Sequence, residues 1–543
     1  MSDPIITAQN APFLKKLGIY TRLSGPGWIQ AAVTLGGGSL VGALYLGVIG
    51  GYEFMWLQPL AMLCGIIMLS AISHVTLSSK ERPFVAAKKH ISPVLAWAWL
   101  IATIIADVVY CSAQYGLGTD AVQNNLGFFN SGTAQTYTLT GIFTVFSLSL
   151  LWMSLGGGKA SKIIEHILKG LVAIVVLAFM AVVVVLAANG SIAWGSFFSG
   201  LVPDFSALFK PTASYSDAIA ATGDNAAFWT KYIADSQRNI IIGAFGSAVG
   251  INMTFLLPYT LLKRGWSKRH RELSRFDLVL GLFVPFIMAT SFLVVATSAQ
   301  FHAKKDSIVS VGNYNAVVDT WLTSKNADFD KTSDTAQAQR DALPDADQQL
   351  AAMVAKRTAK DLAKSLEPAL GKNAQLIFGI GILAMAISTM LVHMMMNGYA
   401  ISEAFGKPGQ KALFMIGAAM PALSGFFSPI LWTGNPDIKT TLNIPAGTIA
   451  TTLLPIAYLI FILLMNSRQT LGDEMPRKRS LINILMLIAG GAASFAAVWN
   501  LIGRYGSKDP FMHNFGMIGL VALPALLLIG IFGFIRNNKS PSS

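Results

Sequence analysis

Two short stretches rich in glycine and small polar residues carry the groups best suited to binding an ion or a small solute. They consist of Thr34, Gly36, Gly37, Gly38 and Ser39, and of Ser247, Gly250, Asn252 and Met253. Each glycine inside a helix costs roughly 1 kcal/mol relative to alanine, so both stretches are expected to interrupt helices. An interruption exposes backbone N–H and C=O groups beside hydroxyl and amide side chains. Together these groups can bind an ion or a small solute.

A second set of candidates lies inside long apolar runs. Asp107 is an acid in the middle of such a run, where a charge costs at least ~2.5 kcal/mol in a membrane, so a functional role is the default expectation. Tyr110 follows three residues later, and the hydroxyls of Ser388 and Thr389 lie in another run. These four residues are candidates for an ion path or for coupling. His393 is interpreted as a helix-packing residue.

The remaining reactive residue types do not form a catalytic pattern. The chain has only seven histidines, and they are scattered. The glycine-rich Gly156–Lys159 segment lacks the Ser or Thr that a phosphate-binding loop requires after its lysine. We therefore expect neither an enzyme nor a cofactor, and we assign no metal-ligating set.

The elements that must position these residues are membrane helices. Hydrophobic residues make up 53% of the chain and charged residues only 12%, whereas soluble proteins average about 25% charged. A helix needs about 20 apolar residues to cross a bilayer. Twelve such runs are found, so the chain is predicted to be an all-α membrane protein with spans at 25–48, 54–78, 94–118, 136–155, 163–188, 239–262, 276–300, 374–401, 412–432, 445–466, 480–502 and 514–535.

The distribution of basic residues predicts the orientation. The two termini and the loops on their side of the membrane hold 23 Lys and Arg residues, against 6 in the short loops of the other side. By the positive-inside rule both termini are cytoplasmic, and we expect a bacterial inner (plasma) membrane location. The net charge of +13 then faces anionic lipid headgroups, so the bilayer is the expected partner and nucleic acid is not.

The predicted organisation has two comparable halves. It comprises a cytoplasmic N-terminus at 1–24, a first repeat at 25–188, an external loop at 189–238, a second repeat at 239–466 and two accessory spans within 480–535. A polar external insertion at 303–373 interrupts the second repeat, and a passive surface hairpin is favoured over a lid. The two glycine-rich breaks lie at matching places in spans 1 and 6, which is typical of an inverted-repeat transporter.

Several segments resemble the Nramp (natural resistance-associated macrophage protein) family of divalent-metal transporters. The matching segments are Gly25–Gly27, Ile104–Val108, Phe276–His302, Leu454–Pro455 and Asn466–Gly472. The resemblance implies a LeuT-type fold, in which spans 1–5 and 6–10 form inverted repeats and two further spans are accessory. It also implies secondary transport by alternating access.

The binding motifs depart from that family. Its Asp-Pro-Gly-Asn metal motif falls on Gly36–Ser39, so the metal-binding aspartate is missing. Its Met-Pro-His motif falls on Gly250–Asn252, which removes a thioether and a proton-handling histidine. Tyr110 replaces a second acid. Without a carboxylate, nothing in the predicted site offsets the dehydration of Mn²⁺ or Fe²⁺.

Two classes of substrate therefore stay open. A divalent cation that keeps its water shell, such as Mg²⁺, retains the family's function with least change. A small amino acid or carboxylate suits half-helix N-termini with no acid nearby.

Ser388 and Thr389 lie where LeuT-like transporters place the hydroxyls of a sodium site, so transport is expected to be sodium-linked or uncoupled. A channel and a transporter-like sensor are competing classes, and the oligomeric state is left open.

Overall fold

The computed structural model describes residues 4–9, 11–79, 81–305, 309–326, 328–371, 373–432, 443–507 and 509–539, and these contain helices but no strand. The helices before the second break are α1 (Pro4–Gln9), α2 (Phe13–Leu23), α3 (Pro26–Thr34), α4 (Gly37–Ile49), α5 (Leu57–Ser78), α6 (Pro83–His90), α7 (Pro93–Asp120), α8 (Thr133–Ser154), α9 (Gly158–Ala188), α10 (Trp194–Ser199), α11 (Ser216–Ala221) and α12 (Ala226–Ser247).

The later helices begin with α13, directly after the second break. They are α13 (Ile251–Lys263), α14 (Arg271–Leu278), α15 (Val284–Phe301), α16 (Val311–Lys325), α17 (Ala336–Asp341), α18 (Asp345–Val354), α19 (Ala359–Ser365), α20 (Glu367–Leu370), α21 (Asn373–Ala404), α22 (Lys411–Phe427), α24 (Asn443–Met465), α25 (Arg468–Leu471), α26 (Arg479–Tyr505) and α27 (Pro510–Lys539). A π-helical turn, Val279–Phe283, joins α14 to α15 in one span.

The predicted all-α membrane architecture is confirmed. Within the described residues, nine helices are long and apolar enough to cross a membrane, and two bent pairs bring the number to eleven. The remaining span, expected at 239–262, is divided between the end of α12 and α13. Helices suit this setting because a bilayer offers no water to backbone N–H and C=O groups.

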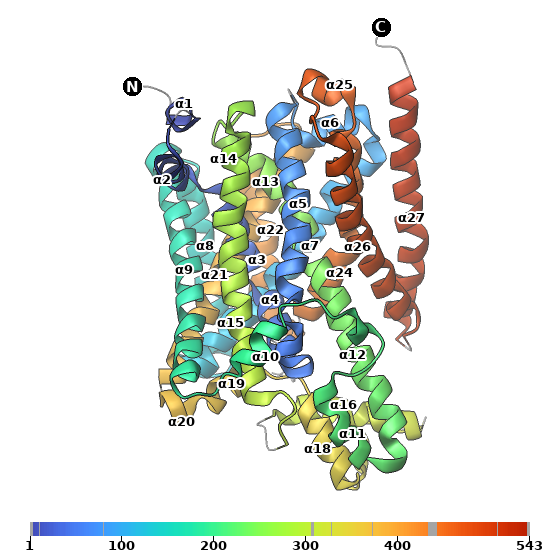
Figure 1. Ribbon diagram of the computed structural model, residues 1–543. Coiled ribbons are helices and arrows are strands. Elements are labelled where there is room, and N and C mark those ends of the chain that lie inside the picture. The colour runs from blue at the N-terminus through green and yellow to red at the C-terminus, as the bar shows by residue number, and fades with distance from the viewer. Residues whose placement is uncertain are drawn as a thin grey trace.

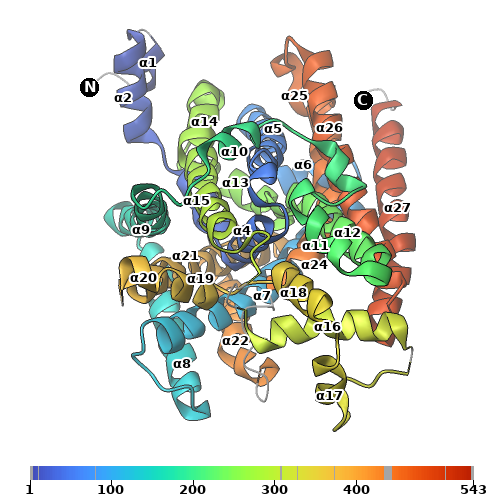
Figure 2. The same ribbon diagram turned by 60° about the horizontal axis from the view of Figure 1, so that its bottom comes forward.

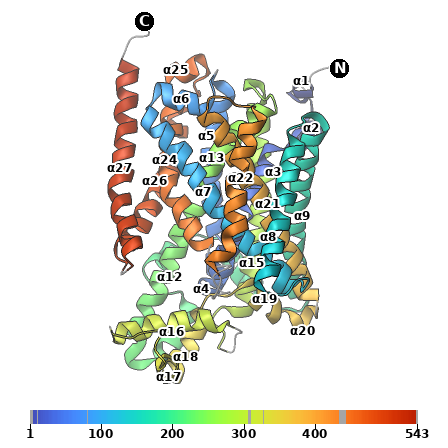
Figure 3. The same ribbon diagram turned by 180° about the vertical axis from the view of Figure 1, so that it is seen from behind.

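Both interrupted spans lie inside the bundle. The first comprises α3 and α4, which meet at an angle of 59°. Helices α5, α7, α15 and α21 pack around these two spans, with α22 and α8 outside them (Figures 1 and 3). The breaks are therefore surrounded by protein, which is the condition under which a membrane helix tolerates them.

The two termini lie at one end of the bundle, which we call the terminal face (Figure 1). The helices of the 303–373 insertion lie at the opposite end, the insertion face. An even number of spans predicts this placement of the termini.

The insertion is built into the protein by a hydrophobic core of its own. Tyr215 and Trp229 from the preceding segment pack there with Val318 and Leu350 from the insertion, all fully buried. Asp347 on α18 accepts a hydrogen bond from Trp229 Nε1 at 2.6 Å. These contacts join the insertion to α11 and α12, which the favoured interpretation as a passive hairpin does not predict.

The last two helices flank the bundle. α26 packs against α24, α12 and α5, and α27 packs mainly against α26 and α24. Only 11% of the most apolar stretch of α27 is buried, so most of this stretch lies on the outer surface of the bundle. The accessory role of the final two spans stays a prediction.

Close packing of α4 on α15 yields a first prediction. A Cβ atom at Gly47 would overlap Thr297 Oγ1 and lie 2.7 Å from the Val294 carbonyl oxygen. Gly47→Ala should therefore destabilise the protein by about 1–3 kcal/mol through overpacking. Thermal unfolding of detergent-purified protein, followed by size-exclusion chromatography, measures this effect.

The matched control is Gly491→Ala on α26, where an added Cβ meets no atom within 4 Å. Equal melting temperatures for Gly47→Ala and the wild-type protein would contradict the packing described here.

Candidate functional site

A cavity of about 540 Å³ lies where the two breaks face each other. Its inner wall contains polar or glycine positions from both interrupted spans and from α7 and α21: Thr34, Gly36, Gly38, Ser39, Gly250, Asn252, Met253, Tyr110, Thr389 and His393. The structure thus brings together most of the residues singled out from the sequence. The volume falls in the range of sites for small organic ligands, about 300–1,000 Å³.

Among the sequence candidates whose burial the structure describes, three do not line this cavity. Gly37 is buried, and its N–H donates to Gln114 Oε1 on α7 at 3.0 Å. Asp107 and Ser388 lie behind the cavity wall, with exposed fractions of 0% and 1%. Ser247 ends α12, and its side chain lies outside the described part of the chain.

Side chains satisfy the backbone at the first break. The chain leaves the helix at Leu35 and is extended at Gly36 (φ −120°, ψ −172°), the residue before α4. Gln114 accepts the N–H of Gly37, which is one of the donors left over at a helix start. Ser39 Oγ donates to the Thr34 carbonyl across the break. The glycines thus turn the chain into a new helix, and the unwound part is shorter than the glycine run.

A thioether links the two broken spans. Thr34 Oγ1 donates to Met253 Sδ at 3.1 Å, and Gly250 N lies 3.4 Å from the same sulfur. Met253 lies three residues beyond the aligned position of the family's methionine. A soft sulfur therefore lies in the site, but it is already hydrogen-bonded to the protein.

A buried polar cluster lies beside the cavity. Asp107 Oδ1 accepts from Asn252 Nδ2 at 3.0 Å and lies 2.9 Å from His393 Nδ1. The His393 ring stacks on Tyr110, with centroids 5.3 Å apart and planes 9° from parallel. The other carboxyl oxygen, Oδ2, has no hydrogen-bond partner among the described residues. The cluster can therefore hold a proton or present a charge next to the site.

His393 is one of the site residues that sequence reasoning missed. It was interpreted as a packing residue, whereas it lines the cavity and contacts Asp107. The available signal was spacing. Thr389 and His393 are four residues apart and therefore lie on one face of a helix.

The hydroxyls of Ser388 and Thr389 point at the first broken span. Both donate to the Ala32 carbonyl, at 3.1 and 3.0 Å. Thr389 Oγ1 also lies 3.5 Å from the Leu35 carbonyl oxygen. These hydroxyl and carbonyl oxygens are hard ligands of the kind that a monovalent cation could use if the hydroxyls rotated.

Charge is distributed unevenly around the cavity. The cavity-lining residues of the described chain include Lys356, Arg504 and His393 but no Asp or Glu. A search of the described residues likewise finds no group of three or more His, Cys, Asp or Glu side chains able to hold a metal ion. The cavity therefore lacks the carboxylate ligands that a dehydrated Mn²⁺ ion prefers.

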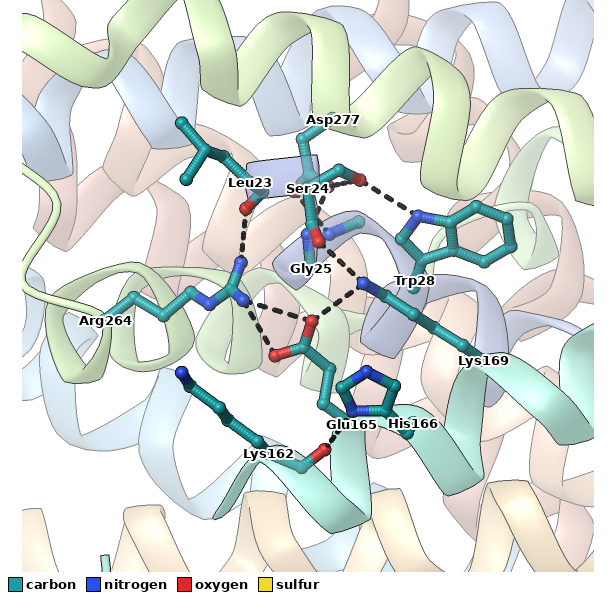
Figure 4. A network of polar contacts seen from close by, with 11 residues as sticks. Leu23, Ser24, Gly25, Trp28, Lys162, Glu165, His166, Lys169, Arg264 and Asp277 are labelled. Atoms are coloured by element: carbon teal, nitrogen blue, oxygen red, sulfur yellow. Dashed lines mark hydrogen bonds and ion pairs between the residues drawn. The ribbon is translucent and has the colours of Figure 1, made fainter. Parts of the chain in front are cut away.

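On the terminal face, ion pairs hold several helices together (Figure 4). Glu165 on α9 accepts from Arg264 Nη2 and from Lys169 Nζ, both at 2.8 Å. Arg264 and Lys169 also donate to the carbonyls of Leu23 and Ser24, at 2.6 and 2.7 Å. Together these bonds fasten the start of α3 to α9 and to the end of α13.

Asp277 on α14 adds to these contacts, and we call the whole set of bonds the closure of the terminal face. Its carboxylate accepts from the N–H groups of Gly25 and Gly27 at 2.8 and 2.6 Å, and from Ser24 Oγ at 2.6 Å. Trp28 Nε1 donates back to Ser24 Oγ at 2.9 Å (Figure 4). A carboxylate on the free N–H groups at a helix start is favoured by both hydrogen bonding and the helix dipole. The main cavity, by contrast, extends toward the insertion face past Tyr45, Tyr232 and Lys356.

Comparison with known proteins gives a consistent result. A family model described as natural resistance-associated macrophage protein-like (Nramp) matches residues 27–327 and 347–503. A manganese transporter of Eremococcus coleocola, crystallised with an aromatic bis-isothiourea compound, is 15% identical, with a TM-score of 0.67. Two single-site mutants of that transporter give TM-scores of 0.69 at 13% and 14% identity. Each comparison covers 97% of both chains, and at these identities it shows the fold alone. No curated protein sequence matches the chain.

The closure yields a second prediction. A smaller cavity of about 320 Å³ lies at the closure and is lined by Ile29, Glu165 and Arg264. Glu165→Gln removes the charge that pairs with Arg264 and Lys169, so the closure should open more often. In a background lacking Cys64 and Cys111, an Ile29→Cys thiol should react about tenfold faster, a population shift of roughly 1.4 kcal/mol.

Glu272→Gln is the matched control, because the pair of Glu272 with Lys16 is on the same face and its carboxylate is 58% exposed. Exposed pairs contribute little to stability. Equal thiol reaction rates in the Glu165→Gln and parent proteins would show that the network does not hold this face shut.

Proposed function

The chain belongs to the Nramp family, and from this premise we propose that it is a secondary transporter that works by alternating access around a remodelled binding site. The terminal face is proposed to be cytoplasmic, as the basic residues predict. The proposal is supported by a cavity that reaches both breaks and extends toward the insertion face, while ion pairs close the terminal face. This arrangement corresponds to the outward-facing state of such a cycle.

The transported solute is proposed to be different from a dehydrated transition metal. The single observation behind this proposal is that the described cavity lining contains no carboxylate. Gly36 and Ser39 occupy positions where the family's motif supplies an aspartate and an asparagine. What faces the solute is glycine backbone, hydroxyls and the Met253 sulfur.

Of the two substrate classes left open by the sequence, the geometry favours a small organic anion such as a carboxylate. Lys356 and Arg504 add positive charge to a cavity without lining acids, and the N-termini of α4 and α13 face it. A hydrated divalent cation is the second candidate. The observation that favours it is the carboxyl group of Asp107, which lies just behind the cavity wall. Among the described residues, its Oδ2 atom has no hydrogen-bond partner.

Coupling to sodium is proposed on the geometry of Ser388 and Thr389. Their hydroxyls and the carbonyls of Ala32 and Leu35 are gathered where α21 crosses the first break. A cation held there would join α21 to α3 and could stabilise one state of the cycle. Uncoupled movement is the alternative within this proposal.

The third prediction concerns metal selectivity. The wild-type protein should bind Mn²⁺ poorly. Gly38→Asp should strengthen Mn²⁺ binding by about tenfold, roughly 1.4 kcal/mol, because it supplies a hard charged ligand. The same change should weaken binding of succinate by charge repulsion. Isothermal titration of purified protein with Mn²⁺, Mg²⁺ and succinate measures all three.

The structure favours position 38 over position 36 for this test. A Cβ at Gly38 has only Tyr110 nearby, at 3.8 Å, whereas one at Gly36 would lie 2.9 Å from Thr389 Oγ1. Gly38→Asn is the control of equal size without the charge. Micromolar Mn²⁺ binding by the wild-type protein would refute the proposed site.

The fourth prediction concerns coupling. An inward sodium gradient should accelerate solute uptake into proteoliposomes. Thr389→Val should abolish this acceleration, because it removes one hydroxyl ligand without changing the size of the side chain, and Thr389→Ser should retain it. Solute-dependent acidification of the vesicles that disappears in Asp107→Asn would instead establish proton coupling through the buried cluster.

A further inference from the structure

The loop 355–358 crosses the mouth of the cavity between two anchored helices. On one side, α18 packs against α11 and α4, and its Asp347 bonds to Trp229 and Asn225 at 2.6 and 3.1 Å. On the other side, α19 packs against α15 and α21. Figure 2 shows α18 beside α11 and α12, and α19 beside α21. The loop is thus held at both ends by different parts of the bundle.

Two consecutive basic residues on this loop have different surroundings. Arg357 is 3% exposed and donates to the carbonyls of Ala352 and Ala355, so it holds the loop in shape. Lys356 instead lines the cavity, with its ammonium 5.3 Å from the centre of the Tyr45 ring. Burial lowers the pKa of Lys356 below its usual value. The unusual feature is therefore a half-buried ammonium group at the entrance of a cavity.

Within the described part of the chain, no carboxylate is paired with Lys356. Among the described residues, none forms an ion pair with its ammonium group. Two acids of the surrounding segments already have partners. Asp361 caps α19 by accepting from the Thr358 N–H at 2.8 Å, and Asp235 pairs with Arg238 at 2.6 Å. The positive charge of Lys356 is therefore directed at the cavity.

The accessory helix α26 supplies a second cationic group. Arg504 lines the same cavity, and its guanidinium contacts Met512 Sδ at 3.7 Å. Trp499 Nε1 donates to Asn239 Oδ1 at 2.9 Å, which ties α26 to α12 beside this wall. Both cations of the entrance thus come from elements outside the two repeats.

We propose that Lys356 and Arg504 form an anion-binding subsite at the entrance, which receives the carboxylate of a small organic anion before it reaches the inner site. This inference rests on the proposed function. Charges of one sign along a low-dielectric cleft raise the local concentration of ions of the other sign by about 10- to 1,000-fold. Ammonium and guanidinium groups both form charge-assisted hydrogen bonds with carboxylates. The insertion is accordingly a selectivity element.

The experiment measures the electrostatic preference of the entrance directly. Gly42 lines the cavity, and an added Cβ there meets open space, so Gly42→Cys places a probe thiol in a background lacking Cys64 and Cys111. Its reaction rates are compared for an anionic sulfonatoethyl and a cationic trimethylammonioethyl methanethiosulfonate. The rate with the anionic reagent divided by the rate with the cationic reagent gives a ratio, which is normalised to the same ratio measured for 2-mercaptoethanol in solution.

The parent protein should favour the anionic reagent by about tenfold. Lys356→Gln and Arg504→Gln should each lower this preference several-fold, and Lys356→Arg should preserve it. Lys360→Gln is the matched control, because Lys360 is an exposed residue of the same insertion. Succinate binding to the full-length protein should weaken in parallel with the thiol preference.

A preference for the cationic reagent, a ratio that Lys356→Gln leaves unchanged, or no reaction with either reagent would each overturn the subsite. The measurement does not require transport. Absence of solute flux in proteoliposomes with an intact anion preference would therefore overturn the proposed function and leave the subsite standing.

Discussion

The structure depends on one constraint, which is that two helices are interrupted inside the bundle, at a depth where lipid cannot hydrogen-bond to their free backbone groups. At the first break, Gln114 accepts the N–H of Gly37 and Ser39 donates to the Thr34 carbonyl. At the second break, Asn252 Oδ1 accepts the N–H of Met253. Each of these bonds uses a side chain aimed at a helix end, and because Gln114 belongs to α7, the packing of α7 against the first break is a requirement of the architecture.

The same constraint explains why so many site residues are engaged with the protein itself. Thr34 hydrogen-bonds to Met253, and Asn252 hydrogen-bonds to Asp107, before any solute is considered. An Nramp site with an aspartate in the first break would carry a charge that demands a cation. Here, neutral side chains satisfy the backbone at the breaks, and the first break carries no aspartate whose charge would need a cation. Among the described residues that line the cavity, the acidic types are missing and the Lys and Arg side chains are Lys356 and Arg504.

The closed face follows a different physical principle. There the free N–H groups at the start of α3 are satisfied by a carboxylate, Asp277, and a second carboxylate, Glu165, binds two cations that also hold backbone carbonyls. Such groups are hydrated when separated, so water would replace the protein partners in the alternating-access cycle proposed above. Polar groups of this kind suit a gate, whereas the apolar packing of α4 on α15 suits a fixed element.

The sequence by itself determined the membrane class, the long spans, the two breaks and their matched positions, because apolar run length and glycine clustering are local properties. It also identified Asp107 and nine of the residues that line the cavity around the two breaks. The tertiary structure alone decided that His393 meets Asp107, that Met253 returns a sulfur to the site, and that Lys356 of the insertion reaches the entrance. These contacts join residues far apart in the chain, up to 286 positions for Asp107 and His393, and nothing in local periodicity records which helix faces turn toward each other. Helix-face pairing is set by the packing of the whole bundle, since a small rotation of α21 or α18 would aim His393 or Lys356 elsewhere.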